Sequence, residues 1–234
     1  MHMSKIPFVR NTGPSTFGAR RCDHPSLAAS ARDYINRVES SETFHVPLET
    51  IEATLKAYAE GFFPMSDNDR LGFYSSDPRS VYFFDSFHVP RSLRRYYRRH
   101  SFDLKTDTAF LEVVRSCRQG RPEWISEFQV QLYAELYKRG HAHSIEAWKD
   151  GELAGGIFGT HFGAAFLAES MFHRVPNASN VCLVYLMEML LRCGFHFCDI
   201  QYANEHTARF HPTDLSMKNF MKIFRAALKD TATF

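Results

Sequence analysis

The sequence of 234 residues lacks most features that would place it in a membrane or in an oxidising compartment. No apolar run approaches the ~20 residues that a membrane-spanning helix needs. The first residues lack the continuous apolar stretch of a secretory signal, so we expect a partly disordered lead-in over residues 1–43, with a transit peptide as the alternative. The five cysteines form no CxxC pair, which disfavours a zinc site and indicates reduced thiols. We therefore expect a cytoplasmic protein without membrane contact.

The positive charge of this chain is local. The net charge is only +2, from 28 Lys and Arg against 26 Asp and Glu, but residues 86–100 contain five arginines and no acid. Spacings of three and four place these arginines on one broad helical face, while Leu93 and Tyr97 can face the protein. They are Arg91, Arg94, Arg95, Arg98 and Arg99. Such a face suits a nucleic-acid backbone and exposed bases. A solvated charged surface is the alternative.

The hydrophobic pattern predicts a mixed fold of the α/β or α+β class. Helices are expected at about 48–58, 90–99, 107–118, 126–139, 179–193 and 214–228. Strands are expected at 73–74, 81–84, 144–148, 155–160, 164–172 and 196–201, with a hairpin turn at Asp150-Gly151. The length allows one large domain or a large domain with a smaller companion.

Three polar residues in apolar surroundings are candidates for chemistry. Asp199 and Gln201 share one face of the strand predicted at 196–201, about 6.5–7 Å apart. Because a buried carboxylate or amide must find partners, the pair either satisfies backbone groups or lines a site. Glu169 lies among apolar residues of another predicted strand. It either points to water or provides a counter-charge for a cationic substrate.

A metal site is the weaker alternative. His141, His143 and Glu146 lie close together in the sequence, and His206 or His211 could supply a further ligand. A protein metal site needs at least three suitable ligands, and nothing in this spacing requires them to meet. We therefore predict no metal.

A series of short motifs resembles one family across residues 57–207. The motifs are Ala57-Tyr-x-x-Gly61-x-Phe-Pro64, Ser75-x-Asp77-Pro-Arg79, Phe87-His-Val-x-Arg-Ser92, Trp124-Ile125, Gly140-His-Ala-His-Ser-Ile-Glu-x-Trp148, Leu153-x-Gly-Gly156, Glu169-Ser-Met-Phe172, Asn177-Ala-Ser179, Asp199-x-Gln201 and Asn204-x-His-Thr207. Together, in this order, they resemble the leucyl/phenylalanyl-tRNA–protein transferases. Single motifs of this length would not be specific.

The resemblance implies a mixed α/β fold with a small N-terminal domain, which we expect over residues 1–85, followed by an acyltransferase domain of the GNAT type over residues 86–234. It implies transfer of Leu, Phe or Met from aminoacyl-tRNA to an N-terminal Arg or Lys of an acceptor protein, which marks that protein for N-degron proteolysis. It further implies a monomer that uses no cofactor. Asp199 and Gln201 would orient the attacking amine and relay its proton, Glu169 would receive the cationic side chain of the acceptor, and the five arginines would bind tRNA.

The resemblance also implies an apolar pocket for the transferred amino acid. Its residues would be Tyr74, Trp124, Ile157, Phe166, Leu183, Leu186 and Leu190. Some positions depart from the family pattern: Phe73 and Tyr74 replace paired tryptophans, and Arg209 and His211 lie where small residues are usual. An acidic acceptor N-terminus therefore stays an alternative. So do an acetyl-CoA-dependent acetyltransferase and a non-catalytic RNA-binding protein.

Overall fold

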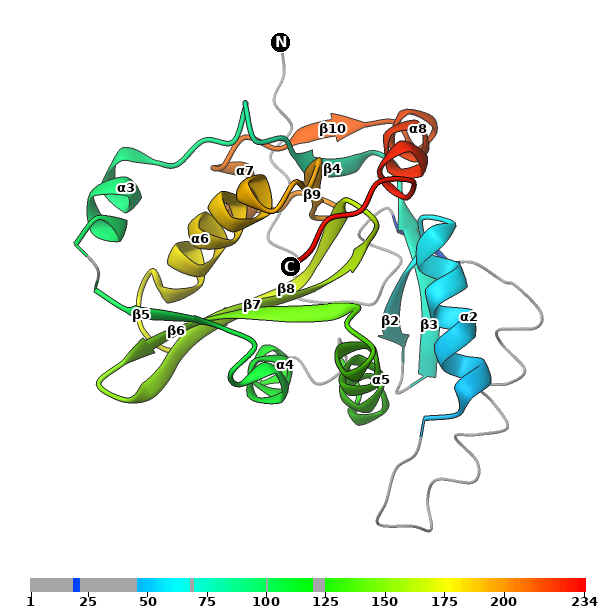
Figure 1. Ribbon diagram of the computed structural model, residues 1–234, viewed down its shortest axis with the longest axis horizontal. Coiled ribbons are helices and arrows are strands. Elements are labelled where there is room, and N and C mark those ends of the chain that lie inside the picture. Colours follow the sequence, from blue (N-terminus) through cyan, green and yellow to red (C-terminus); the bar gives the residue numbers. More distant parts are fainter. Residues whose placement is uncertain (1–18, 22–45, 68–69, 100, 120–124) are drawn as a thin grey trace.

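The main layer of the protein is a seven-stranded sheet (Figure 1). The computed structural model describes residues 19–21, 46–67, 70–99, 101–119 and 125–234. The strand order is β10-β4-β9-β8-β7-β6-β5. These strands are β4 (Arg79–Tyr82), β5 (Asp103–Thr106), β6 (Ala142–Lys149), β7 (Glu152–Phe162), β8 (Ala165–His173), β9 (Phe197–Asp199) and β10 (Thr213–Leu215). Neighbouring strands are antiparallel, except that β8 and β9 run parallel.

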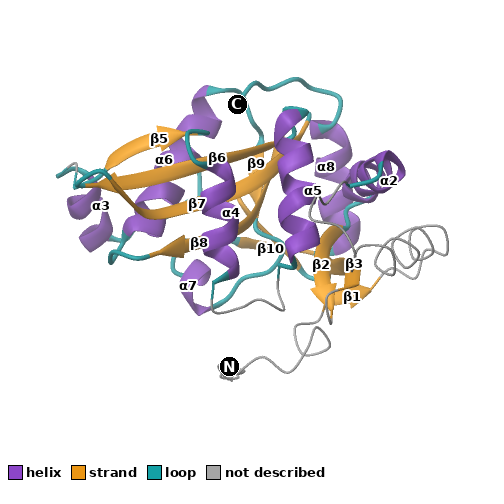
Figure 2. Ribbon diagram, turned by 90° about the horizontal axis from the view of Figure 1, so that it is seen from below, coloured by secondary structure: helices purple, strands orange, loops and turns teal. Residues whose placement is uncertain are grey.

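Helices cover both faces of this sheet (Figures 1 and 2). One face carries α6, and the other carries α4 and α5. These helices are α4 (Phe110–Arg118), α5 (Glu127–Lys138) and α6 (Ala178–Arg192). The ring of Phe158 in β7 packs edge-on against those of Phe110 and Tyr133, with centroids 6.1 and 4.9 Å apart. Successive side chains of a strand alternate between faces, so Ile157 points to the α6 side.

A smaller three-stranded sheet, in the order β1-β3-β2, lies beside α2. The elements here are β1 (Ala19–Arg21), α2 (Leu48–Ala59), β2 (Phe63–Asp67), β3 (Arg70–Ser76) and the last helix, α8 (Met217–Ala227). A Cβ on Gly61, just after α2, would lie 2.6 Å from Met221 Sδ of α8. The last helix therefore packs against the first part of the chain. The domain boundary expected at 85/86 falls after β4, which pairs within the large sheet, and the two-domain division stays a prediction.

Most of the longer predicted elements are confirmed. The helices expected at 48–58, 126–139, 179–193 and 214–228 correspond to α2, α5, α6 and α8, and the strands β6, β7 and β8 form the expected meander. The pattern does not predict β5, β10 or α7 (Glu205–Ala208), because elements of three or four residues are too short to show a period. The residue before α6 is Asn177 in a left-handed conformation, and Ser179, where the predicted helix begins, lies inside α6.

Glu146 explains why α4 begins later than its sequence pattern suggests. Its buried carboxylate accepts hydrogen bonds from the backbone N–H groups of Thr108 and Ala109 at 3.2 and 3.0 Å. It also accepts hydrogen bonds from the hydroxyl groups of Thr108 and Ser144, the latter at 2.6 Å. These bonds satisfy donors at the start of α4, where an acid is also favoured by the helix dipole. The structure therefore gives Glu146 a structural role.

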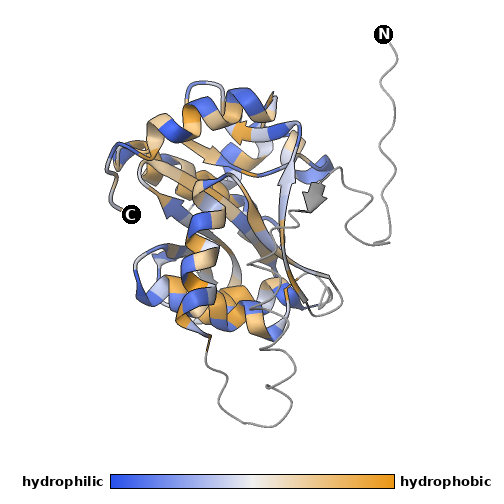
Figure 3. Cartoon of the chain, turned by 90° about the vertical axis from the view of Figure 1, so that its right-hand side faces the viewer, coloured by the Kyte–Doolittle hydropathy of each residue, from blue (hydrophilic) through white to orange (hydrophobic). Residues whose placement is uncertain are grey.

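The helices show hydrophobic and hydrophilic stretches that alternate around their axes, as expected where one side of a helix is buried (Figure 3). Of the helices in the described part of the chain, none is long and apolar enough to cross a membrane.

Glu146→Ala tests the structural role of this acid. Removal of the carboxylate leaves buried donors without acceptors, and we expect the free energy of unfolding to fall by about 3 kcal/mol. For a chain of this size the melting temperature should drop by about 6–12 °C. Differential scanning calorimetry would measure it, with the exposed Glu152→Ala as the control of equal charge. Equal melting temperatures for the two variants would contradict the role of Glu146.

Candidate active site

The parallel strands β8 and β9 separate part of the way along the sheet. They pair only through Ala165↔Phe197, Phe166↔Cys198 and Leu167↔Asp199. Beyond this point β8 continues to His173, while β9 ends at Asp199. In α/β sheets, ligands commonly bind where the carboxyl ends of parallel strands diverge. The next side chains along the two strands, those of Glu169 and Gln201, therefore lie at a favourable place for a site.

A β-bulge places Glu169 at this opening. In the ladder of β7 and β8, Phe158 pairs with Ser170 and Gly159 pairs with Ala168, so Glu169 is the extra residue. A bulge redirects a side chain that regular alternation would send elsewhere. The strands approach so closely here that a Cβ on Gly159 would lie 2.3 Å from the carbonyl oxygen of Leu167. Glycine at this position is therefore part of the geometry that presents Glu169.

The carboxylate of Glu169 accepts hydrogen bonds from four neutral side chains. The donors are Tyr58 at 2.6 Å, Thr160 at 3.2 Å, Tyr133 at 3.3 Å and Gln201 Nε2 at 3.3 Å. Burial raises the pKa of Glu169 to about 7, and the nearby charge of Asp199 acts in the same direction. No cation among the described residues forms an ion pair with this carboxylate. The site thus contains a partly buried acid that can accept a positive charge.

Asp199 is held differently, because it forms a fully buried ion pair with Arg79 of β4. Arg79 Nη2 lies 2.6 Å from Asp199 Oδ2, and Arg79 Nε lies 2.9 Å from Oδ1. Both side chains have 0% exposure. The guanidinium also lies between the rings of Phe63 and Phe220, with centroids 4.9 and 4.7 Å away. Both carboxylate oxygens of Asp199 are therefore occupied inside the protein.

Gln201 connects this ion pair to Glu169. Its backbone N–H donates to Asp199 Oδ1 at 2.8 Å, and its side chain donates to Glu169. The predicted strand at 196–201 ends early, because Gln201 has a left-handed backbone with φ of +61°. The carbonyl oxygen of Gln201 accepts hydrogen bonds from the hydroxyl of Ser76 at 2.6 Å and from the backbone N–H of Ser80 at 3.1 Å. Gln201 thus reaches Glu169 through a fixed turn, whereas we expected simple alternation along a strand.

A small pocket opens beside Glu169 and Gln201. Its apolar walls include Phe63, Met65, Ile125 and Phe158. The residues expected to form the aminoacyl pocket lie elsewhere, in the closed core, and have 0–3% exposure. They are Tyr74, Ile157, Phe166, Leu183, Leu186 and Leu190. None of these six lines the pocket beside Glu169, and Trp124 lies outside the described residues. Their role in binding the amino acid stays a prediction.

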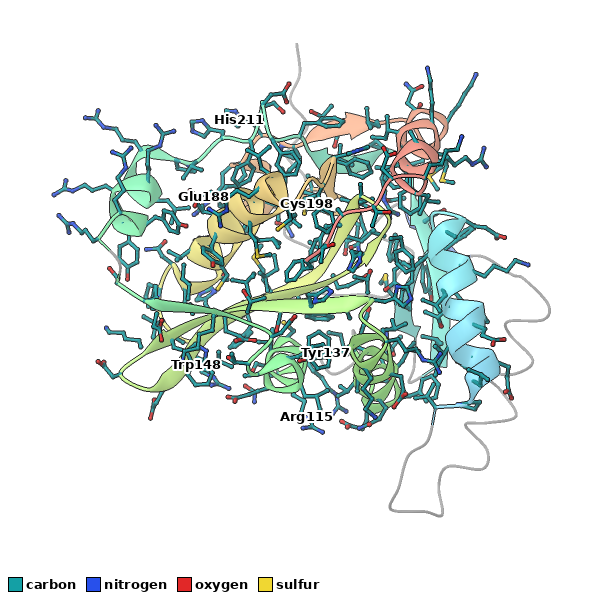
Figure 4. The ribbon with its side chains drawn as sticks, viewed as in Figure 1. Arg115, Tyr137, Trp148, Glu188, Cys198 and His211 are labelled. Carbon is teal, nitrogen blue, oxygen red and sulfur yellow. The ribbon has the colours of Figure 1, made fainter. Side chains whose placement is uncertain are left out.

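The arginine-rich segment forms α3 (Arg91–Tyr97) and the turn that follows it. All five arginines are exposed and line one concave surface together with His88 and Val89. Leu93 is buried, and the hydroxyl of Tyr97 donates to Glu188 of α6 at 2.8 Å, so the expected orientation of the helix is confirmed. Side chains of α3 extend away from the body of the molecule in Figure 4, where Glu188 is labelled.

Sequence reasoning missed the roles of Arg79, Tyr58 and Tyr133. Arg79 begins a strand whose residues are all buried, and an arginine in such a run needs an acidic partner. This signal could have paired it with Asp199, which lies in an equally apolar strand. The two tyrosines give no such signal, because most buried tyrosines simply pack in the core.

The fold and the pocket define a class of protein: a mixed α/β protein with a partly buried acid where two parallel strands diverge. Two models of the leucyl/phenylalanyl-tRNA protein transferase family match the chain, one over residues 81–225 and one, for the N-terminal domain, over residues 50–77. Relatives that carry this name include one from Salinibacter ruber, 42% identical over 180 residues, which are 76% of this chain and 80% of that protein. Another, from Paramagnetospirillum magneticum, is 42% identical over 192 residues, 79% of this chain and 92% of that protein.

The chain belongs to the leucyl/phenylalanyl-tRNA–protein transferase family and is therefore an aminoacyltransferase. The fold is also similar to some solved structures of low sequence identity. A conserved protein of unknown function from Bacteroides thetaiotaomicron has a TM-score of 0.44 and 12% identity, over 81% of this chain and 73% of that chain. This likeness is too remote to bear on function.

Arg79→Leu tests how strongly the buried ion pair holds the site together. The change leaves the charge of Asp199 buried without a partner, and we expect a loss of about 3–5 kcal/mol in the free energy of unfolding. The double variant Arg79→Leu/Asp199→Leu should be more stable than Arg79→Leu alone, because it removes both charges. Urea unfolding would measure both, with the exposed Arg115→Leu as the control. A loss below about 1 kcal/mol for Arg79→Leu would argue against this role.

Proposed function

We propose that this chain transfers Leu, Phe or Met from aminoacyl-tRNA to the N-terminal Arg or Lys of acceptor proteins, in the pocket beside Glu169 and Gln201. The observation that carries the proposal is a partly buried acid with no cationic partner among the described residues, in a pocket of a chain that belongs to this family. The product would be marked for N-degron proteolysis. Because charged tRNA is made in the cytoplasm, we propose that the enzyme acts there, as a monomer.

The reaction mainly requires the protein to position its two substrates. The α-amine of the acceptor attacks the carbonyl carbon of the aminoacyl ester, a C–N bond forms, and the C–O bond to the terminal ribose breaks. The ribose oxygen that carried the amino acid takes up the proton that the amine loses. An α-amine has a pKa of about 7.7–8, so roughly a tenth of it is already neutral at pH 7. The ester is activated, and neither step calls for a metal or a diffusible cofactor.

Gln201 and Asp199 would have different roles in orienting the amine. Gln201 lines the pocket, so its side-chain oxygen can accept a hydrogen bond from the attacking amine and help to remove its proton. Asp199 is inaccessible and fully bonded, which supports a positioning role through the backbone of Gln201. We therefore propose that Asp199 acts on the amine only through Gln201.

Glu169 would bind the cationic side chain of the acceptor. Four neutral donors hold its carboxylate in place, and burial disfavours its charged form. A guanidinium or ammonium group would offset that cost by pairing with the carboxylate. An acidic N-terminus would place a second negative charge beside Glu169. The site therefore favours basic acceptors over acidic ones.

The arginines around α3 would hold the tRNA acceptor arm. They are exposed, share one concave surface and form no ion pair with a described residue. These properties support contacts with phosphate groups, since each neutralised phosphate releases counterions from the RNA.

The transfer reaction is the direct test of this function. Purified protein would be incubated with Leu-, Phe- or Met-charged tRNA and with matched reporter proteins that begin with Arg, Lys, Asp, Glu or Ala. We expect mass spectrometry to detect one added residue only on the reporters that begin with Arg or Lys. Addition to Asp or Glu would overturn the role of Glu169 but keep the reaction. Binding of tRNA without any transfer would instead support a non-catalytic RNA-binding protein.

Glu169→Gln tests the acceptor site, because it removes the charge of this side chain and keeps its shape. The preference is the kcat/KM for a peptide that begins with Arg divided by the kcat/KM for a matched peptide that begins with Gln. We expect the loss of the charge to reduce this ratio by about 10–100-fold. In the unchanged enzyme the carboxylate gains its charge as pH rises through about 7, so the KM for the Arg peptide should fall over that range. The Gln peptide is the internal control. If Glu169→Gln retained both the preference and this pH dependence, Glu169 would not bind the acceptor cation.

A further inference from the structure

The last helix, α8, carries a row of exposed cations that the reaction described so far does not use. Lys218, Lys222, Arg225 and Lys229 follow spacings of four, three and four, so they lie along one side of the helix and its C-terminal turn. The row extends over about 16 Å of helix, a length over which a nucleic-acid duplex presents several phosphates. We call these four residues the α8 cation row.

The α8 cation row is not balanced by acids. Residues Met217–Ala227 contain no Asp or Glu, and none of the four cations forms an ion pair with any residue in the described part of the chain. Elsewhere Lys138 pairs with Glu135 along one helix. Lys218 even lies in the first turn of α8, where the helix dipole disfavours a positive charge. Ion pairing does not account for this arrangement, and the helix dipole favours only the cations at the C-terminal end, such as Arg225 in the last turn.

The opposite side of α8 packs against the buried ion pair of the active site. Phe220 is fully buried, and its ring centroid lies 4.7 Å from the guanidinium carbon of Arg79. Arg79 in turn holds Asp199, whose carboxylate accepts the backbone N–H of Gln201. Because a helix with its side chains is about 10–12 Å across, the cation row lies roughly one helix diameter from this ion pair. The cation row therefore faces away from the ion pair, on the outer side of the helix that packs against it.

We propose that the α8 cation row is a second tRNA-binding surface, which contacts backbone phosphates near the aminoacyl end of the bound tRNA. The inference rests on the proposed function, which brings the end of a charged tRNA to the pocket. The row is separate from the arginines of α3, because α3 lies at the left of the molecule in Figure 1 and α8 at its upper right. Basic side chains extend outward from both places in Figure 4. Two separated contacts would orient the acceptor arm as well as bind it.

Charge removal along α8 tests the proposal. The variant Lys218→Ala/Lys222→Ala/Arg225→Ala/Lys229→Ala would be compared with the unchanged protein for binding to charged tRNA between 50 and 200 mM salt. Each phosphate contact contributes about 0.9 to the slope of log affinity against log salt. If all four cations bind phosphates, we expect the slope to become shallower by about 3 to 4 and the KM for charged tRNA to rise at least tenfold.

The matched control removes four other exposed cations that lie outside α3 and α8: Arg115 of α4, which is labelled in Figure 4, Lys138 and Arg139 at the end of α5, and Lys149 at the end of β6. This variant has the same net charge as the α8 variant, so any general effect of charge is common to both. Circular dichroism would confirm that both variants are folded. A salt slope and a KM equal to those of the control would overturn the proposal. Absence of transfer by the unchanged protein would instead count against the proposed function itself.

Discussion

The buried ion pair between Arg79 and Asp199 connects segments 120 residues apart and determines where the site lies. It joins the head of β4 to the end of β9, and the rings of Phe63 and Phe220 enclose the guanidinium. Desolvation makes such a pair a weak source of net stability, but loss of one partner is costly. The pair therefore acts mainly by permitting one arrangement, in which the backbone of Gln201 is held against Asp199.

The pocket depends on that arrangement and on the bulge in β8. A regular strand would send Glu169 to a different place, and the bulge directs it toward Gln201. Burial is the main cause that raises its pKa to about 7, although the hydrogen bonds from Tyr58, Thr160 and Tyr133 act in the opposite direction. The result is an acid whose charge is fixed in position and is stabilised further only when a cation arrives.

The sequence predicts the long elements well, because α2, α5, α6 and the meander of β6 to β8 have enough residues to show their periods. It also identifies Asp199, Gln201 and Glu169 as polar residues in apolar surroundings. It does not predict their arrangement, since a left-handed Gln201 and a bulge at Glu169 both break the alternation on which a strand prediction rests. The partner of Asp199 is indicated only by the presence of Arg79 in a buried run, because nothing local links two residues so far apart in the chain.

The two proposed substrates, a tRNA and an acceptor with a basic N-terminus, carry opposite charge, and the structure separates the groups that would bind them. Cations lie on exposed helical surfaces of α3 and α8, whereas Glu169 lies within the pocket. At physiological salt the Debye length is about 8 Å, so exposed cations act mainly on phosphates that touch them. Screening is weaker inside the pocket, where a single carboxylate can discriminate between acceptors. A net charge of only +2 is thus compatible with binding a polyanion, because the local arrangement of charge decides which substrate each surface attracts.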